Sequence, residues 1–369
     1  MTEIISKAPG RICLFGDHQD YLGLPVIACA IDRHITLTAK PNETLFFNIK
    51  MPDVNTSRII DINSDLNTIK KGDYLMVAIK VLKSYDCIPN IGYDIICSGN
   101  IPINSGLSSS SALIIAWIYF LIEAFGKNHL KKPEIISRIA YEVEVLEQGD
   151  PGGKMDQYSI GLGHIMYLET GQKTVYELIQ NKPTASLIIG DSGVPKKTLD
   201  LLSELKSKSW EGINIIKNTF KHFNLNTVTL ENHKPYLNVL PKELQHYFLA
   251  AIKNHDITRK ALSILKSKEI DYNIIGDLMS AHHEVLKNML KITVPAIDKM
   301  IDFANNAGAL GSKIVGSGGG GCIVAITEKG DEKAVINAIK KAGAKDAFQV
   351  SIDSGARAIS KTIEETGAN

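Results

Sequence analysis

The chain has 369 residues, a length that favours two domains over one. Hydrophobic residues make up 44% and charged residues 22%, and 41 Lys and Arg against 40 Asp and Glu leave a net charge of +1. These are the proportions of an ordinary globular protein, and the charge balance gives no reason to expect nucleic acid or an anionic membrane as a partner. No apolar run reaches the length that spans a bilayer.

Residues 1–16 lack the layout of a secretory signal, and the five cysteines are scattered without any CxxC spacing. We therefore expect a cytoplasmic protein with free thiols, and neither a disulfide framework nor a zinc site.

The first forty residues combine strand-like runs with one polar loop. The pattern predicts a short strand from residue 3, a turn at 8–10 and a second strand at 11–15, with further strands at 26–30 and 35–39. Between them, residues 17–23 read DHQDYLG, four polar side chains and an aromatic residue bounded by glycines. The residues alone are compatible with a solvated turn and with a polar ligand site.

A glycine- and serine-rich loop precedes a long apolar run. Residues 101–117 read IPINSGLSSSSALIIAW, in which Gly106 and four serines lead into a predicted buried helix at 112–120. The first backbone N–H groups of a helix have no intrahelical partner and carry partial positive charge, which favours phosphate. The stretch is not a Walker A loop, which needs GxxxxGK[ST]. A serine-capped core helix is the alternative interpretation.

The middle of the chain adds a second glycine-rich loop. Helices are predicted at 74–84 and 132–148 and strands at 93–98, 163–170 and 186–190, with Glu144 off the apolar stripe of its helix. Residues 149–158 read GDPGGKMDQY. This loop is either a plain turn or a close backbone approach to a small molecule, with Asp156 aimed at it.

The last part of the chain is predicted to be mostly helical from 196 to 291, with a break at 235–241. A helix at 295–306, a hairpin-like unit at 311–326, a helix at 331–342 and a strand at 347–352 follow. The six residues GSGGGG at 316–321 are too rich in glycine for a plain hairpin turn. They are compatible with a connecting loop and with a functional role as a flexible lid or a neighbour of phosphate. His282 and His283 lack the HExxH order and are interpreted as structural.

Three glycine-bearing motifs, taken in this order, resemble those of the GHMP small-molecule kinases, a family that includes galactokinase, homoserine kinase and mevalonate kinase. They are PGR followed by GDHQDY at 9–21, PINSGLSSSSA at 102–112, and KIVGSGGGGC at 313–322. The resemblance implies an α+β, two-domain GHMP kinase fold. Residues 1–190 would form a domain like domain 2 of ribosomal protein S5, residues 191–369 a ferredoxin-like domain, and the active site the cleft between them.

Within this family the chain is most similar to the galactokinase-like sugar kinases. It carries their His18, Asp20 and Tyr21, although Asp17 replaces a glutamate and Lys154 an apolar residue. The resemblance implies ATP- and Mg²⁺-dependent phosphorylation of a sugar hydroxyl at the anomeric position, by a monomer or homodimer. The GGKxDQ form is also similar to heptose-phosphate kinases. A heptose-phosphate or uronic-acid kinase, a mevalonate-type kinase and a non-catalytic sugar and ATP sensor remain alternatives.

The resemblance also assigns roles to residues of the three motifs. Asp156 and Arg11 would be catalytic, and Ser110 and Glu144 would hold Mg²⁺. The substrate-binding residues would be Asp17, His18, Asp20, Tyr21 and Gly153. The ATP-binding residues would be Gly106, Leu107, Ser108, Ser109, Ser110, Ser111, Gly318 and Gly319.

Overall fold

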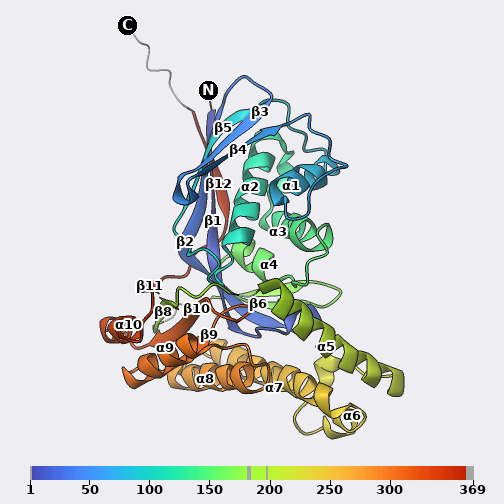
Figure 1. Cartoon of the computed structure of the whole chain (residues 1–369), viewed down its shortest axis with the longest axis vertical. Helices are drawn as coiled ribbons and strands as arrows, with labels where there is room; N and C mark the ends of the chain where they lie inside the picture. Colours follow the sequence, from blue (N-terminus) through green and yellow to red (C-terminus); the bar gives the residue numbers. More distant parts are fainter. Residues whose placement is uncertain (1, 181–183, 197, 363–369) are drawn as a thin grey trace.

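The computed structural model describes residues 2–180, 184–196 and 198–362. These residues form two β-sheets, with helices packed against both (Figure 1). The architecture is therefore α+β, as the sequence predicts.

The larger sheet of the described residues has the strand order β12-β1-β2-β5-β3-β4, with β6 beside β2 and β7 beside β6. Neighbouring strands are antiparallel except for the parallel pair β3 and β5. The strands are β1 (Thr2–Phe15), β2 (Val26–Pro41), β3 (Phe46–Met51), β4 (Thr56–Asp61), β5 (Tyr93–Gly99), β6 (Ile165–Glu169), β7 (Val175–Ile179) and β12 (Arg357–Thr362).

The strand β1 runs without interruption through Pro9 and Gly10, so the prediction of a turn at 8–10 is wrong. The register against β2 shifts between Pro9 and Gly10, where the ladder is irregular. Proline lacks a backbone N–H and is tolerated in a strand at such an irregularity. In the same way, the two strands predicted at 26–30 and 35–39 are parts of the single strand β2.

Four helices lie along one side of this sheet in Figure 1: α1 (Tyr74–Lys83), α2 (Ser109–Phe125), α3 (Pro133–Tyr141) and α4 (Met155–Leu162). Helix α2 packs on β1 and β2 and is apolar on all sides, which is typical of a helix enclosed by neighbours. Trp117 and Phe120 of α2 are fully buried. The helix predicted from the apolar run is thus confirmed.

The smaller sheet is antiparallel, in the order β11-β8-β10-β9. Its strands are β8 (Ser186–Asp191), β9 (Gly311–Ile314), β10 (Cys322–Thr327) and β11 (Asp346–Val350). The glycine run at 316–321 connects β9 to β10, which confirms the predicted hairpin-like unit. Helices α9 (Pro295–Asn306) and α10 (Glu332–Lys341) pack against this sheet.

The remaining helices form the layer at the bottom of Figure 1: α5 (Thr198–Thr219), α6 (Lys234–Leu237), α7 (Lys242–Leu265) and α8 (Tyr272–Asn288). Short turns of 3₁₀-helix occur at η1 (Asp20–Leu22), η2 (Pro52–Val54), η3 (Asn128–Lys131) and η5 (Leu225–Thr227). A five-residue π-helix, η4 (Glu142–Leu146), continues directly from α3. Helix α8 begins after Asp271, whose carboxylate accepts hydrogen bonds from the backbone N–H groups of Asn273 and Ile274.

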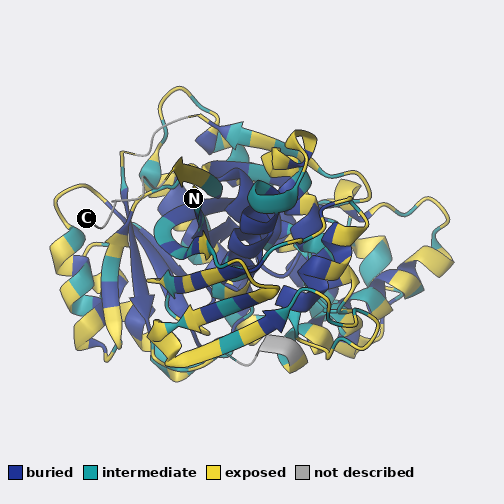
Figure 2. Ribbon diagram, turned by 90° about the horizontal axis from the view of Figure 1, so that it is seen from above, coloured by how far each residue is buried: buried dark blue, intermediate teal, exposed yellow. Residues whose placement is uncertain are grey.

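The two sheets share one continuous hydrophobic core. The boundary predicted between residues 190 and 191 falls at the end of β8, which belongs to the smaller sheet. The chain returns to the larger sheet with β12. Figure 2 shows the buried residues gathered in the middle of the molecule and the exposed residues around its periphery.

All five cysteines are buried and free, which confirms the prediction of free thiols. Within the described part of the chain, no helix combines the length and the apolar character needed to cross a bilayer.

Candidate active site

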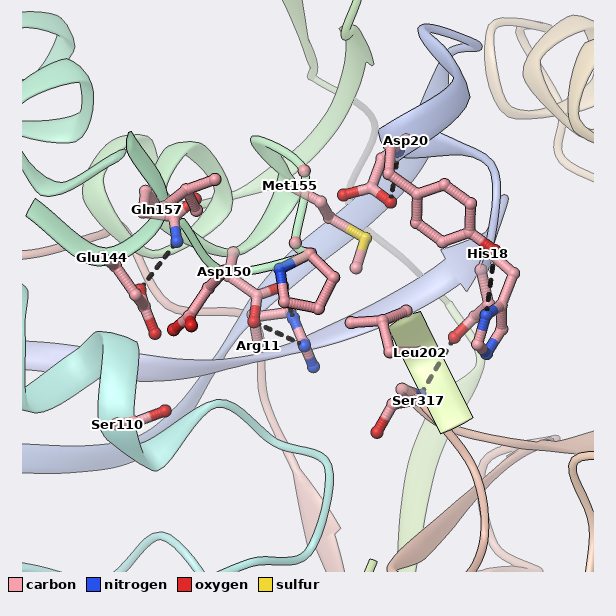
Figure 3. Close-up of a pocket in the computed structure, with 18 of the residues that line it drawn as sticks. Arg11, His18, Asp20, Ser110, Glu144, Asp150, Met155, Gln157, Leu202 and Ser317 are labelled. Atoms are coloured by element: carbon pink, nitrogen blue, oxygen red, sulfur yellow. Dashed lines mark hydrogen bonds and ion pairs between the residues drawn. The ribbon is translucent and has the colours of Figure 1, made fainter. Parts of the chain in front are cut away.

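A cavity of about 180 Å³ lies where the three glycine-bearing motifs meet (Figure 3). Its wall includes Arg11 of β1, the loop after β1, the start of α2, η4, the loop before α4, and the residues that follow β9. In Figure 3, Arg11, Glu144 and Gln157 lie on one side, and His18, Asp20 and Ser317 on the other. The fold therefore brings together most of the residues that the motifs singled out.

Asp156 and Arg11 form a two-pronged ion pair in this cavity. Arg11 Nε donates to Oδ1 of Asp156 at 2.7 Å and Nη2 donates to Oδ2 at 2.8 Å. Nη1 of Arg11 donates to the carbonyl of Gly106 at 2.5 Å, and the Ser108 hydroxyl donates to Asp156. The side chain of Asp156 remains 28% exposed, against 5% for Arg11. The carboxylate is thus fixed in position and still accessible from the cavity.

Burial acts to raise the pKa of Asp156, but the charge and hydrogen bonds of Arg11 outweigh it, and the net pKa is lowered. Asp156 is therefore ionised at neutral pH. For Arg11, burial acts to lower the pKa and the neighbouring carboxylate raises it, with a net rise. Both partners are charged, so the site contains a fixed anion beside a fixed cation.

The serine loop exposes a helix N-terminus at the cavity. Ser108 has φ of 59° and, among the described residues, no side chain caps α2. Because the Ser108 hydroxyl bonds to Asp156, the alternative of a serine-capped core helix is wrong. Gly106 has φ of 91°, and a Cβ there would lie 2.6 Å from the carbonyl oxygen of Val315, so this position requires glycine. The uncapped N–H groups remain for an anionic ligand.

Leu107 is fully buried, and its carbonyl accepts from the backbone N–H of Arg11 at 3.1 Å. This bond fixes the serine loop to β1.

Glu144 lies in the π-helix η4, an irregularity often found at functional sites. Ser111 Oγ donates to its Oε1 at 2.9 Å, and Gln157 Nε2 donates to its Oε2 at 2.7 Å. Burial, followed by the charge of Asp156, raises the pKa of Glu144 to about 7. A cation beside Glu144 would favour its ionised form.

The oxygen atoms of Ser110 and Glu144 are suited to Mg²⁺, and they are too few to hold a metal ion without further ligands. The described residues contain no group of three or more His, Cys, Asp or Glu able to hold a metal ion. Glu144 and the exposed Ser110 both line the cavity. Mg²⁺ is commonly held by one or two protein oxygens together with substrate phosphates and waters, so the residues present fit this ion.

The loop after β1 forms the opposite wall. The Tyr21 hydroxyl lies 3.3 Å from His18 Nδ1, within hydrogen-bond distance. Asp20 faces the cavity, and burial together with the charge of Asp156 raises its pKa to about 6. A Cβ at Gly153 would lie 2.1 Å from Asp20 Oδ2, so only glycine allows this approach.

Three buried polar atoms on the cavity wall have no hydrogen-bond partner among the described residues: Nε2 of His18, Oε1 of Gln157 and Oγ of Ser317. Buried polar groups are nearly always hydrogen-bonded, so unpaired ones require an explanation. Because all three line one cavity, they are available to form hydrogen bonds with a ligand there.

Asp17 forms a buried ion pair with a lysine of the third motif. Its Oδ2 accepts from Nζ of Lys313 at 2.6 Å, and its Oδ1 accepts from the backbone N–H of Gly316 at 3.0 Å. Lys313 also donates to the Cys13 carbonyl at 2.9 Å. Side-chain exposures of 1% for Asp17 and 0% for Lys313 leave the pair sealed from solvent. Asp17 lines the cavity, but each of its oxygens accepts a protein hydrogen bond that holds the third motif against the first, so its contact with sugar hydroxyls stays a prediction.

Gly318 and Gly319 make close contacts within the protein, and their role in binding ATP stays a prediction. The N–H of Gly319 donates to the Ile292 carbonyl at 2.7 Å, and a Cβ at Gly318 would lie 2.6 Å from that oxygen. Both glycines therefore pack against the segment between α8 and α9. Gly316 and Ser317 are the residues of this motif that line the cavity.

The sequence interpretation missed Lys196, Gln157 and Ser317. Lys196 lies in the segment between β8 and α5 and lines the cavity. Burial, followed by the charge of Arg11, lowers its pKa, and no described carboxylate lies within ion-pair distance. A lone lysine in a loop gives no sequence signal. Gln157 and Ser317 are neighbours of singled-out residues and could have been found by extending the motifs by one position.

Comparisons with known proteins match three parts of the chain to family models. Residues 1–41 match the galactokinase galactose-binding signature, residues 67–164 the GHMP kinases N terminal domain, and residues 259–345 the GHMP kinases C terminal model.

Individual proteins match over nearly the whole length. Galactokinase of Thermotoga neapolitana is 30% identical over 353 residues, which cover 94% of this chain and 95% of the relative. Mevalonate kinase of Thermococcus sibiricus is 26% identical, with 92% and 93% covered. The solved structure of Lactococcus lactis galactokinase complexed with galactose has a TM-score of 0.83 at 22% identity, covering 96% of this chain and 95% of that one.

Proposed function

The chain belongs to the GHMP kinase family, as a galactokinase-like sugar kinase, and we propose on this premise that it transfers the terminal phosphate of ATP to the anomeric hydroxyl of its sugar. The observation that carries the proposal is the pair of Asp156 and Arg11. The pair joins the segment that matches the galactose-binding signature to the first turn of α4, and the Ser108 hydroxyl of the serine loop also donates to Asp156.

Asp156 is the group that receives the proton. The sugar oxygen forms a bond to the γ-phosphorus, the bond from that phosphorus to the β–γ bridging oxygen breaks, and ADP leaves. The hydroxyl proton passes to a carboxylate oxygen of Asp156. Phosphoryl transfer needs little deprotonation early in the reaction, so a carboxylate of low pKa suffices to orient the hydroxyl and accept the proton late. A positioned base of this kind contributes roughly 10²–10⁴-fold.

The backbone of Gly106 to Ser111 and the open N-terminus of α2 are the proposed cradle for the ATP phosphates. Arg11 and Lys196 supply positive charge on the same cavity wall. Fixed cations placed where negative charge develops stabilise a transition state without reorganisation. We assign Lys196, which has no described anionic partner, to the transferred phosphate.

Ser110 and Glu144 are the residues that would hold Mg²⁺. When bound, the ion would neutralise phosphate charge. The hydrogen bonds from Ser111 and Gln157 hold the Glu144 carboxylate in place for that role.

The sugar is assigned to the wall formed by His18, Asp20, Tyr21 and Gly153. The unpaired atoms of His18, Gln157 and Ser317 are suited to its hydroxyls, because a buried polar group left unpaired by the wrong isomer costs free energy. A non-catalytic sensor does not need a charged, accessible Asp156, which favours the enzyme over that alternative.

A coupled assay of ADP release across hexoses, pentoses, uronates and sugar phosphates tests the proposal, with ³¹P NMR to locate the phosphate. We expect sugar-stimulated release, a product phosphorylated at the anomeric carbon, and no turnover of the methyl glycoside of the best sugar. Transfer to the methyl glycoside would contradict the anomeric assignment. Tight binding of ATP and sugar without release would favour the sensor.

A further inference from the structure

A second cavity, of about 410 Å³, adjoins the active site. Asp20, Tyr21, Gly152 and Gly153 line both cavities, so the close contact between Gly153 and the Asp20 carboxyl forms the divide between them. The second cavity is otherwise lined by Leu22, Gly23, Tyr141, Lys154, Thr170, Gly171, Gln172, Lys206, Trp210, Lys217 and Asn226.

Helix α5 runs past both cavities. Leu202 lines the active site, while Lys206, Trp210 and Lys217 line the second cavity. At 3.6 residues per turn, residues 206, 210 and 217 lie within about 40° of one another around the helix, so they share one face. Residues 206 and 217 are about 16 Å apart along the helix axis, and the Lys217 ammonium extends back over the Trp210 ring, 5.0 Å from its centre. The Trp210 indole N–H donates to the Tyr21 carbonyl at 3.2 Å, which fixes this face against the sugar-binding loop.

The second cavity is strongly basic. Its lining has three lysines, Lys154, Lys206 and Lys217, and among the described lining residues Asp20 is the one carboxylate. No described carboxylate lies within ion-pair distance of any of the three lysines. The nearest acidic residues of α5 in sequence, Glu204 and Glu211, project from the opposite side of the helix.

Two of the three ammonium groups are held in place. Lys154 donates to the Gly171 carbonyl at 2.7 Å and to the Thr174 hydroxyl at 3.0 Å, which leaves one of its three N–H donors for a ligand. Nζ of Lys217 lies 5.0 Å from the centre of the Trp210 ring, a cation–π contact. Burial also lowers the pKa of Lys154 somewhat. Three lysines without a carboxylate of the described residues within ion-pair distance, beside the proposed sugar cavity, are suited to an anionic part of the substrate.

We propose that the acceptor sugar carries an anionic substituent, a phosphate or a carboxylate, which extends past Asp20 and Gly153 and binds to Lys206, Lys217 and Lys154. This inference rests on the proposed function, because it places the rest of the sugar in the active-site cavity. It narrows the substrate class from sugars in general to sugar phosphates or sugar acids.

Matched sets of acceptors test the inference with the unmodified protein. Each set consists of a hexose, its uronate and its 6-phosphate, in the galacto, gluco and manno configurations, assayed for kcat/KM with saturating ATP. We expect one anionic member to exceed its neutral hexose at least about tenfold, the effect of one charged hydrogen bond. The uronate and the phosphate distinguish the two anions. Added salt should shrink the advantage, because exposed charge is screened.

Variants that remove a lysine charge from α5 test the same inference. Lys206→Gln and Lys217→Gln should each lower the anionic-to-neutral ratio of kcat/KM by about tenfold, through the KM of the anionic sugar. Lys208→Gln is the matched control, because Lys208 lies on the opposite face of the same helix and pairs with Glu211 at 2.9 Å. It should leave the ratio unchanged.

The outcomes separate this inference from the proposed function. If neutral hexoses are phosphorylated as well as their anionic partners, and the two variants leave the ratio unchanged, the anion subsite is overturned and the sugar kinase stands. If no acceptor is phosphorylated, isothermal titration calorimetry measures the binding of the uronate and the 6-phosphate in the presence of a non-hydrolysable ATP analogue. Binding that is lost in Lys206→Gln but kept in Lys208→Gln would support the subsite and overturn the proposed function. Absence of both binding and transfer would overturn both.

Discussion

Two buried ion pairs connect the motifs of this protein, and they differ in how far the aspartate is exposed. Asp17 with Lys313 and Asp156 with Arg11 each join an aspartate to a cation distant in sequence, at 2.6 Å and 2.7 Å. The first pair is sealed, with exposures of 1% and 0%, whereas Asp156 is 28% exposed. The difference indicates that access to the cavity, rather than pairing with a cation, separates a reacting carboxylate from a supporting one.

The pKa values alone would not separate the two aspartates. For both, burial acts to raise the pKa and a neighbouring cation lowers it, with a net lowering in each case. A perturbed pKa is a pointer to function, yet structural ion pairs perturb pKa values as well. The geometry decides, because both oxygens of Asp17 are occupied by protein donors.

Removing the sealed carboxylate should have the largest effect on stability. Asp17→Ala leaves Lys313 buried without its anion, so we expect unfolding to become easier by about 3–5 kcal/mol. Chemical denaturation measures this change. Glu211→Ala, which breaks a half-exposed pair with Lys208, should change stability by less than about 1 kcal/mol. Similar losses in the two variants would show that sealing Asp17 from water has no consequence.

Asp20 is a third carboxylate at the cavity, and no cation of the described residues lies within ion-pair distance of it. Asp20→Ala should raise the KM for the sugar by up to about a hundredfold, because charged hydrogen bonds to hydroxyls are lost. The KM for ATP should change little, since Asp20 lies on the wall opposite Glu144 and Gln157 (Figure 3). Steady-state kinetics with each substrate varied measures both values. An unchanged sugar KM in a folded variant would remove Asp20 from the sugar site.

Lys196 is a cation on the cavity wall, and no carboxylate of the described residues lies within ion-pair distance of it. Lys196→Met keeps the apolar stem and removes the charge, so we expect kcat/KM for ATP to fall by about tenfold, the lower range for a charged hydrogen bond. The substitution should not lower the unfolding temperature, because no ion pair is broken. A stability loss with unchanged kinetics would make Lys196 structural.

Glu144 gives the smallest expected effect, a dependence on pH. Its pKa of about 7 lies above that of a free carboxyl, so the group is protonated below neutral pH and ionised above it. Because a metal ion requires the ionised form, the apparent KM for Mg²⁺ should fall about fivefold as the pH rises from about 6 to about 7. Glu144→Gln should abolish this dependence. A KM for Mg²⁺ that stays constant over this range in the wild-type protein would exclude Glu144 as a ligand.

Local patterns in the sequence predicted much of the fold and several residues of the candidate site. The apolar run after the serines predicted α2, and the glycine run predicted the connection between β9 and β10. The placement of Asp156, His18 and Asp20 at one cavity followed from the motifs in which they stand. These features depend on neighbours in the chain, which a sequence shows directly.

Features that depend on distant contacts could not be predicted. The sequence around Asp17 does not indicate that its carboxylate pairs with Lys313, because the two residues meet only when the two sheets pack together. The continuity of β1 through Pro9 depends on its partner strand β2, whose register shifts there. Lys196 enters the site through the path of the chain after β8.

We propose that Asp156 acts on the reacting hydroxyl, while Asp17 holds the first and third motifs together. Asp156→Asn keeps the size of the side chain and one acceptor oxygen but cannot take the proton. Asp150→Asn is the control, because Asp150 lies in the loop that leads into α4 and accepts a hydrogen bond from the Tyr74 hydroxyl.

The most direct test is the single-turnover rate of phosphoryl transfer with ATP and sugar bound, measured for both variants. We predict that Asp156→Asn lowers this rate by about 10²–10⁴-fold with both substrates still bound, and that Asp150→Asn has a mild effect. A rate lost in Asp150→Asn and retained in Asp156→Asn would contradict the assignment of the base.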